Sequence, residues 1–278
     1  MPEPSPPISS SAATDAGAVT ERLEFARTLI REAGEVALAY FRRAGSLSVS
    51  NKGVQDVVSE ADVAVEVLIK ERIAEAWPSD AFLGEETGHA DFPGSTGVWV
   101  VDPIDGTQPF VSGLPTWCIS IAYVRGQVVE FGLVNAPAGG ELFVGGRGVP
   151  ATRNDLPIAL HPGTELTDGL TYLGCSARIP ADEIVPVFDR LMRRHGMYVR
   201  HGSGALGLCD VACGRLLGLV EPHINSWDCL GGIAVLTAAG GVTNDYLAGD
   251  ALTAGNWLVA ANPGTYAALR EVLRGPDR

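Results

Sequence analysis

The stretch Trp99-Val-Val-Asp-Pro-Ile-Asp-Gly-Thr107 carries two carboxylates, Asp102 and Asp105, out of a short apolar run and into a turn. The proline after Asp102 favours extended geometry in the residue before it, so a strand is expected up to the first carboxylate. Gly106 lets an oxyanion approach the backbone, and a helical turn starting near Thr107 would direct N–H groups at that anion. The stretch therefore predicts divalent-metal and phosphate chemistry.

The overall composition is that of an ordinary globular protein. The 278 residues are 46% apolar and 19% charged, and the formal net charge is −13. An acidic chain disfavours nucleic acid or an anionic membrane as the main partner. A phosphorylated substrate stays compatible with this charge, because bound cations invert the local field.

The cysteines and the N-terminus point to a reducing, cytoplasmic location. Five cysteines with irregular spacing do not predict a disulfide framework. Cys209 and Cys213 are four residues apart on an expected helix, and a buried apolar face explains them better than a thiol pair or half a metal site. Residues 1–16 are expected to be a disordered tail, because the chain start lacks a basic segment followed by an apolar one.

Hydrophobic periodicity divides residues 17–278 into two halves, about 17–150 and 155–278, with residues 146–165 as a crossing loop. Meandering strands in the first half and strand–helix alternation in the second predict an α+β fold of mixed sheets layered with helices. Helices are expected at 17–43, 60–77, 181–195, 205–214, 228–239 and 263–273, and strands at 98–101, 117–124, 128–135, 141–145, 170–174, 197–200, 216–220 and 257–260.

Three further acidic sites allow two interpretations each. Glu85 with its neighbour Glu86 is either a solvated turn or part of a metal site. Asp62 shares a helix face with Glu66, which is either exposed or functional. Asp228 precedes an apolar helix, where an aspartate is usually an N-cap, although it could also reach a metal.

Together these motifs resemble those of the inositol monophosphatase family, whose members are Mg²⁺-dependent, lithium-sensitive phosphatases. The resemblance rests on Glu85-Glu86, the Asp-Pro-Ile-Asp-Gly-Thr element, and Trp227-Asp228 with the downstream Ala-Ala-Gly-Gly, and it covers about residues 20–274. It implies a layered α-β-α-β-α sandwich of the sugar-phosphatase type, and a homodimer.

The resemblance also implies a set of metal ligands and catalytic residues. One Mg²⁺ would be bound by Glu85, Asp102 and the carbonyl of Ile104, and a second by Asp102, Asp105 and Asp228, with a weaker third ion near Glu85. Asp62 and Thr107 would orient and activate the attacking water, and Glu85 would join them as a catalytic residue. Oxygen ligands at this density suit Mg²⁺, Mn²⁺ or Ca²⁺ rather than zinc. Two such ions can stabilise the attacking and leaving oxygens, so no protein nucleophile is required.

Substrate contacts follow from the same resemblance. The phosphate would lie at Gly106 and Thr107. The leaving group would contact residues matching the family's sugar pocket, namely Asp105, Ser203, Gly204, Glu221 and Asp228. Lys52 resembles a basic residue near the catalytic water. Three positions depart from the family pattern: Pro109 replaces a usual Asn, Gly207 a usual Asp or other polar residue, and Pro222-His223 an ordinary turn. His223 could touch substrate, although a surface position explains it better.

The sequence thus predicts a Mg²⁺-dependent phosphomonoesterase acting on a small polyol or sugar phosphate by direct attack of a metal-activated water. Inositol 1-phosphate is the leading substrate. Histidinol phosphate, fructose 1,6-bisphosphate and 3′-phosphoadenosine 5′-phosphate are alternatives, because one fold hosts several specificities. A catalytically silent member with a regulatory role is the remaining alternative, and the presence of every proposed ligand carboxylate disfavours it.

Overall fold

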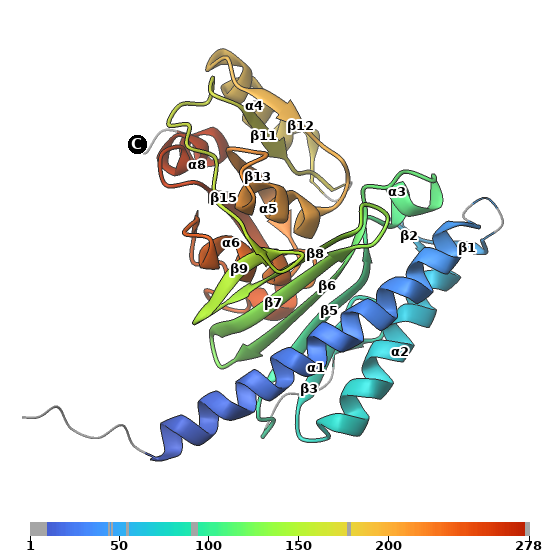
Figure 1. Ribbon diagram of the computed structural model, residues 1–278. Helices are drawn as coiled ribbons and strands as arrows, with labels where there is room; N and C mark the ends of the chain where they lie inside the picture. Colours follow the sequence, from blue (N-terminus) through green and yellow to red (C-terminus); the bar gives the residue numbers. More distant parts are fainter. Residues whose placement is uncertain are drawn as a thin grey trace, which may run out of the picture.

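Two mixed β-sheets and the helices around them form five layers (Figure 1). The computed structural model describes residues 10–43, 45, 47–53, 56–89, 94–176 and 179–275, and the side chains of residues 10–16, 51–57 and 89 are not among those described. In order, the layers are a helix pair, a large sheet, a second helix pair, a smaller sheet and a third helix pair. This arrangement confirms the predicted α-β-α-β-α sandwich.

The large sheet places the opening sequence stretch near its centre. Its strand order is β10-β9-β8-β7-β6-β5-β3-β4 in the described residues, and β5 pairs in parallel with β3 but antiparallel with β6, which makes the sheet mixed. Its strands are β3 (Ala81–Gly84), β4 (Gly88–His89), β5 (Val98–Asp105), β6 (Cys118–Arg125), β7 (Val128–Ala136), β8 (Glu141–Gly146), β9 (Val149–Arg153) and β10 (Leu156–Pro157).

The apolar run of β5 is continuous because both faces of the sheet are covered. Trp99 and Val101 pack in the core under the first helix pair, whereas Val98 and Val100 pack in the core shared with the second pair. Successive side chains of a strand point to opposite faces, so a strand buried on both faces needs apolar residues at every position.

The outer face of the large sheet is covered by α1 (Ser10–Phe41) and α2 (Glu60–Ala76), which lie side by side (Figure 1). The predicted stripe of α1 is buried as expected, for example at Ala26, Ile30 and Ala33. The helix begins at Ser10 rather than near residue 17, so part of the expected tail is helical, and residues 1–9 lie outside the described residues. A separate hairpin of β1 (Val49–Gly53) and β2 (Asp56–Ser59) leads into α2.

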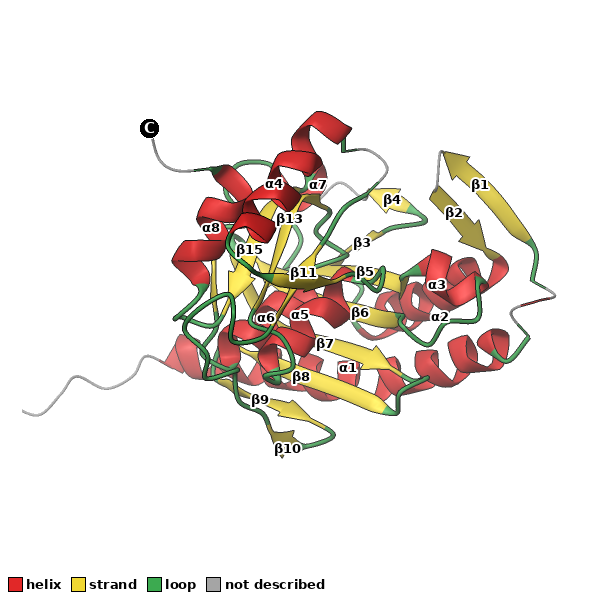
Figure 2. Cartoon of the chain, turned by 90° about the horizontal axis from the view of Figure 1, so that it is seen from above, coloured by secondary structure: helices red, strands yellow, loops and turns green. Residues whose placement is uncertain are grey.

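The smaller sheet supplies the second half of the fold (Figure 2). Its order is β12-β11-β13-β15-β14, with parallel and antiparallel pairs, as predicted for a mixed sheet. Helices α5 and α6 lie between the two sheets, and α4 and α8 cover the outer face. The elements are α3 (Thr107–Val111), β11 (Leu170–Leu173), α4 (Ala181–Arg193), β12 (Met197–Val199), α5 (Gly204–Ala212), β13 (Gly218–Ile224), α6 (Leu230–Ala238), β14 (Val242–Thr243), α7 (Ala251–Ala254), β15 (Asn256–Ala261) and α8 (Tyr266–Arg274).

The expected crossing loop 146–165 was the main error in the predicted elements. It contains β9 and β10, which extend the large sheet at one edge. These strands are short, and Leu156 at the edge is largely exposed, so neither carries the apolar pattern that identifies a strand. No helix in the described part of the chain combines the length and apolarity needed to span a membrane.

Candidate active site

A β-bulge at the end of β5 sets the geometry of the two central aspartates. Asp102 pairs with Ser120 and Asp105 with Cys118, so three steps along β5 match two along β6. In a regular strand, residues three apart would point to opposite faces of the sheet. The extra residue changes this alternation, and both carboxylates line the same cleft.

Three carboxylates from separate segments converge at the base of this cleft. One oxygen each of Glu85, Asp102 and Asp228 lies within 4.8 Å of the others. Asp102 Oδ1 accepts the Ile104 N–H at 3.0 Å, whereas Oδ2 is buried with no hydrogen-bond partner among the described residues. Burial, and after it the negative charge of Glu85, raises the pKa of Asp102 well above its usual value. A buried, unpaired acidic oxygen among other carboxylates fits a divalent cation.

Asp228 lies beside a helix start, but it is not the helix cap. The N-cap of α6 is Cys229, which makes no capping hydrogen bond through its side chain. Asp228 Oδ2 instead accepts the side-chain amide of Asn225 at 2.9 Å. The Asp228 carboxylate lies in one group with those of Glu85 and Asp102, and the capping interpretation is wrong.

Asp105 is held by the start of α5. Its Oδ2 accepts the Ser203 hydroxyl and the Ala205 N–H, both at 2.7 Å, and its Oδ1 accepts the Gly204 N–H at 3.2 Å. Burial and then the charge of Asp228 raise the pKa of Asp105 to about 7, although these hydrogen bonds oppose the rise. Asp105 thus ties the central strand to the second half of the fold.

Asp62 and Thr107 are brought together as predicted, although they are 45 residues apart. The Thr107 hydroxyl donates to Asp62 Oδ1 at 3.0 Å, and the backbone N–H of Ser59 donates to Oδ2 at 2.9 Å. Asp62 is fully buried in the capping box that begins α2, so the exposed-face alternative is wrong. Burial raises the pKa of Asp62 above its usual value.

Glu66, which was grouped with Asp62 on one helix face, has a separate structural role. Its carboxylate accepts the backbone N–H groups of Glu86 at 2.9 Å and Thr87 at 2.7 Å. These two bonds hold the turn that carries Glu85. Gly84 is required here because the Glu66 carboxylate packs directly against the place where a Cβ would lie. Helical spacing placed Glu66 beside Asp62, but no sequence signal paired it with this turn.

The turn between β5 and α3 depends on Gly106. Its φ of 97° lies in the left-handed region, and a Cβ there would come within 3.0 Å of the Thr116 carbonyl oxygen. Both the backbone conformation and the space therefore favour glycine. Thr107 opens α3, and Pro109 lies inside its first turn, as the sequence predicted.

The cleft has a volume of about 880 Å³ and is lined by residues from both halves of the chain. Its walls include the predicted residues Glu85, Asp102, Ile104, Asp105, Gly106, Thr107, Gly204, Glu221 and Asp228. Ser203 is fully buried behind Asp105 and does not line the cleft. Asp62 is also behind the wall and reaches the cleft through Thr107.

Glu221 projects from β13 into the same cleft and is almost fully buried. Burial, and then the negative charges of Asp228 and Asp105, raise the pKa of Glu221 to about 8. The proposed ring-hydroxyl acceptor is therefore positioned beside two of the proposed metal ligands.

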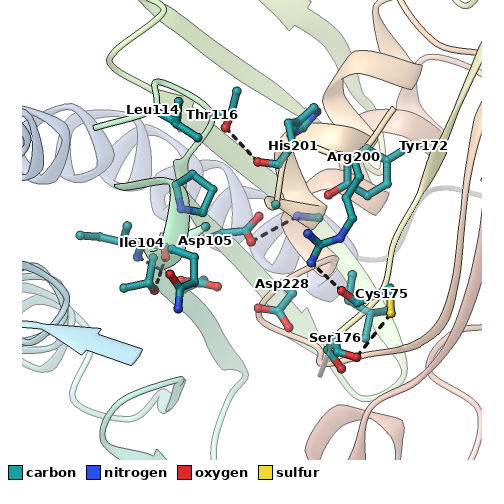
Figure 3. Close-up of a pocket in the computed structure, with 18 of the residues that line it drawn as sticks. Ile104, Asp105, Leu114, Thr116, Tyr172, Cys175, Ser176, Arg200, His201 and Asp228 are labelled. Carbon is teal, nitrogen blue, oxygen red and sulfur yellow. Dashed lines mark hydrogen bonds between the residues drawn. The ribbon is translucent and has the colours of Figure 1, made fainter. Parts of the chain in front are cut away.

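One wall of the cleft was not foreseen from the sequence. Tyr172, Ser176 and His201 line it together with Arg200, which reaches inward from the end of β12 (Figure 3). They come from the ends of β11 and β12, two neighbouring parallel strands. Carboxyl ends of parallel strands commonly form binding sites. Their alignment, and not any motif, was the signal that could have identified this wall.

The positions that depart from the family pattern have different explanations. Gly207 is buried, and a Cβ there would come within 2.9 Å of the Tyr172 ring, so Tyr172 occupies the space that a larger side chain would need. Pro109 lines the cleft beside Gly202. His223 bonds to the Ala254 carbonyl and does not line the cleft, in agreement with the surface interpretation. The side chain of Lys52 lies outside the described residues.

The cysteines take no part in disulfides in the described structure. Cys209 is fully buried and Cys213 is half-buried, in agreement with the apolar-face interpretation. Cys118 is buried beside Asp105, with its Sγ 3.7 Å from Oδ2.

Comparisons with known proteins agree with this geometry. A sequence model of the inositol monophosphatase family matches residues 18–274. Inositol monophosphatase 1 of Solanum lycopersicum is 35% identical over 267 residues, which cover 93% of this chain and 96% of that protein. Nus factor SuhB of Haemophilus influenzae is 32% identical over 243 residues, 86% of this chain and 90% of that protein. The crystal structure of the extragenic suppressor protein suhB from Bartonella henselae has a TM-score of 0.84 at 27% identity, covering 93% of this chain and all of that one.

Proposed function

The chain belongs to the inositol monophosphatase family, and we propose that it is a Mg²⁺-dependent phosphomonoesterase acting on a small polyol or sugar phosphate, with inositol 1-phosphate as the leading substrate. The observation that carries this proposal is the convergence of Glu85, Asp102 and Asp228 around a buried, unpartnered Asp102 oxygen at the base of the cleft.

The proposed metal ligands divide into two overlapping sets. Glu85, Asp102 and the Ile104 carbonyl would hold one Mg²⁺, and Asp102, Asp105 and Asp228 a second. Asp105 can serve in spite of its hydrogen bonds to α5, because a carboxylate oxygen has more than one lone pair. When bound, Mg²⁺ supplies positive charge that activates water and stabilises the leaving oxygen.

Asp62 and Thr107 would position the attacking water. Because the Thr107 hydroxyl donates a hydrogen bond to Asp62, the lone pairs of the hydroxyl oxygen are directed away from that carboxylate. Thr107 can therefore accept a hydrogen bond from a water in the cleft. The backbone of Gly106 and Thr107 would contact the phosphate at the same turn, in the space that the missing side chain of Gly106 leaves.

The leaving alcohol would lie on the side of Glu221. Asp105, Gly204 and Asp228 line the cleft beside it. A hydroxyl-rich leaving group suits these acceptors, because hydrogen bonds to buried carboxyl groups are costly to leave unmade. Ser203 would act indirectly, by holding Asp105.

A regulatory role is a second candidate function. It is favoured by the relative named as a Nus factor, whose identity to this chain is close to that of the relative named as an inositol monophosphatase. The presence of all the proposed ligands favours catalysis in this chain. A cytoplasmic homodimer, without nucleic acid or membrane as a partner, remains our expectation from the resemblance and the composition.

A phosphate-release assay tests the proposal directly. The four substrates are inositol 1-phosphate, histidinol phosphate, fructose 1,6-bisphosphate and 3′-phosphoadenosine 5′-phosphate. We expect release with Mg²⁺, none with chelator, and inhibition by lithium. Absence of release from all four esters with Mg²⁺ present would reject the enzymatic function and favour the regulatory one. Release that is unaffected by chelator would reject the metal-dependent mechanism.

A further inference from the structure

Residues 200–203, the segment between β12 and α5, lie against two parts of the first half that the proposed chemistry uses. The Ser203 hydroxyl donates to Asp105 Oδ2 at 2.7 Å. A Cβ on Gly106, in the turn proposed to bind phosphate, would come within 3.3 Å of both the Gly202 carbonyl oxygen and the Ser203 Cβ. The two segments therefore leave no room for a side chain between them. The position of segment 200–203 sets that of Asp105 and of the phosphate turn.

His201 joins this segment to the first half through its backbone and to α5 through its ring. Its carbonyl oxygen accepts the Thr116 hydroxyl at 2.8 Å (Figure 3). Its imidazole Nε2 lies 3.2 Å from Oδ2 of Asp210, which is in the last turn of α5. The ring also packs edge-on against Tyr172, with ring centroids 4.9 Å apart. Asp210 and Tyr172 together fix where the imidazole lies.

The surroundings of the imidazole decide which of its nitrogens carries the proton when the ring is neutral. Nδ1 is buried and has no hydrogen-bond partner among the described residues. A proton on Nδ1 would be a buried donor without an acceptor, which is costly. An ionised carboxylate only accepts hydrogen bonds, so Nε2 carries the proton and donates to Asp210. Asp210 therefore holds the ring of His201 in one orientation.

Asp210 also has a second partner, which reaches the first half of the chain. Arg215 Nη1 donates to Asp210 Oδ1 at 2.9 Å and to Glu141 Oε2 on β8 at 2.8 Å. The Arg215 side chain is 42% exposed, whereas those of His201 and Asp210 are 14% and 15% exposed. A hydrogen bond that is shielded from water is electrostatically stronger. The link from Asp210 to His201 is therefore the better placed of the two to hold segment 200–203.

We propose that Asp210 is a positioning residue that acts through His201. The pair would fix segment 200–203, and with it Asp105 and the phosphate turn, in the arrangement that the reaction needs. Neither side chain has to touch the substrate for this role. Small displacements of groups around the reacting atoms lower the rate strongly. The proposal rests on the proposed phosphatase function and adds two residues to its site.

Single and double variants test whether Asp210 acts through His201. His201→Leu and Asp210→Ala should each lower kcat/KM about 10-fold, measured on inositol 1-phosphate or on whichever of the four esters is hydrolysed. The double variant should also lose about 10-fold, because two residues that form one interaction do not contribute independently. A loss of about 100-fold in the double variant, the product of the two single losses, would overturn the proposal.

Two matched variants separate this role from general support of the fold. His201→Gln keeps an N–H donor near the place of Nε2 and should recover most of the activity that His201→Leu loses. Arg215→Met removes the other partner of Asp210 and should lower kcat/KM less than about 3-fold. Equal losses in His201→Gln and His201→Leu would overturn the proposal, and so would equal losses in Arg215→Met and Asp210→Ala.

Circular dichroism establishes that each variant is folded before its activity is compared. If Asp210→Ala does not fold, Asp210→Asn replaces it in the same comparison. Its amide has a single acceptor oxygen and cannot serve both partners as the carboxylate does.

A measurement on the metal-free protein separates failure of the pair from failure of the phosphatase function. At pH 8, proton–nitrogen correlation spectra of the imidazoles should show a protected Nε2–H of His201, identified by its absence in His201→Leu. Asp210→Ala should abolish this signal. If the signal behaves so but none of the four esters is hydrolysed, the pair stands and the phosphatase function fails. If esters are hydrolysed but wild type lacks the signal, the pair fails alone.

Discussion

At the scale of single residues, the two central aspartates, Asp102 and Asp105, have different roles. Asp102 has an oxygen that no described donor satisfies, whereas Asp105 accepts three hydrogen bonds from the start of α5. Asp102 therefore fits a metal ligand whose second oxygen accepts only the local Ile104 N–H. Asp105 fits a ligand that also joins the two halves of the protein.

Asp105→Asn should lower phosphate release roughly 100-fold or more, because the amide removes a negative charge from the proposed metal site. The Mg²⁺ concentration for half-maximal activity should rise as well. Steady-state kinetics across a Mg²⁺ series measures both effects. Asp189→Asn, on an exposed helix face, serves as the control and should behave as wild type. A turnover rate of Asp105→Asn close to that of wild type would contradict the proposed mechanism.

Thr107→Val should lower kcat about 100-fold or more while changing the affinity for Mg²⁺ little, because the hydroxyl positions water and is not a proposed ligand. Thr107→Ser keeps the hydroxyl and should recover most of the activity. The comparison is made by kcat at saturating Mg²⁺. Equal loss in both variants would show that the methyl group matters, not the hydroxyl.

At the scale of elements, α2 organises two parts of the site from one face. Its first turn holds Asp62, and Glu66 one turn later holds the segment that carries Glu85. Residues four apart lie on one helix face, so a single rigid helix sets both positions. The bulge in β5 likewise sets the relative positions of Asp102 and Asp105.

Glu66→Gln should weaken Mg²⁺ binding about 10-fold or more, because one of the two backbone N–H groups would lose its carboxylate acceptor and the Glu85 turn would loosen. Glu71→Gln changes an exposed residue on the same helix and provides the matched control. Titration with Mg²⁺, monitored by calorimetry, measures the difference in Mg²⁺ affinity between the two variants. Identical affinities in the two variants would refute this role for Glu66.

At the scale of the whole molecule, the acidic cluster makes stability depend on pH and metal. The folded state raises the pKa of Asp105 from 3.8 to about 7 and also raises that of Asp102. Between pH 4 and pH 7 the folded metal-free protein therefore holds more protons than the unfolded chain. Its free energy of unfolding should fall as the pH rises through this range.

Denaturant unfolding in chelator tests this expectation. The metal-free wild type should be less stable at pH 8 than at pH 5, with Asp105 contributing about 3 kcal/mol of the difference. Asp105→Asn should lose part of that dependence, because its neutral amide does not titrate, although it can accept only part of the three hydrogen bonds from the start of α5. Mg²⁺ should restore stability at pH 8, because it binds the deprotonated carboxylates. If, in chelator, the free energy of unfolding of wild type rises from pH 5 to pH 8 relative to that of Asp105→Asn, the result contradicts the proposed origin of the pH dependence in these carboxyl groups.

The sequence predicted the elements with long apolar patterns and missed the short ones, which include β3 between β5 and β4 and the strands at the edge of the large sheet. The buried stripe of α1 and the continuous run of β5 were identified because packing requires an apolar residue at each inward position. Strands β9 and β10 were missed because edge strands need few apolar residues. At the candidate site, Asp102, Asp105 and Thr107 were found from one motif, whereas Arg200 and Ser176 belong to no motif.

The local sequence by itself determined the strand, the turn at Gly106 and the oxygen-rich chemistry of the site, because these depend on neighbouring residues and on side-chain type. Only the tertiary structure decided which carboxylates share a metal site, that Asp105 is anchored to α5, and that Glu66 supports Glu85. The wall that carries Arg200 also arises only when β11 and β12 align. These contacts join segments far apart in the chain, and their distances are set by sheet order and packing, which no single stretch of sequence encodes.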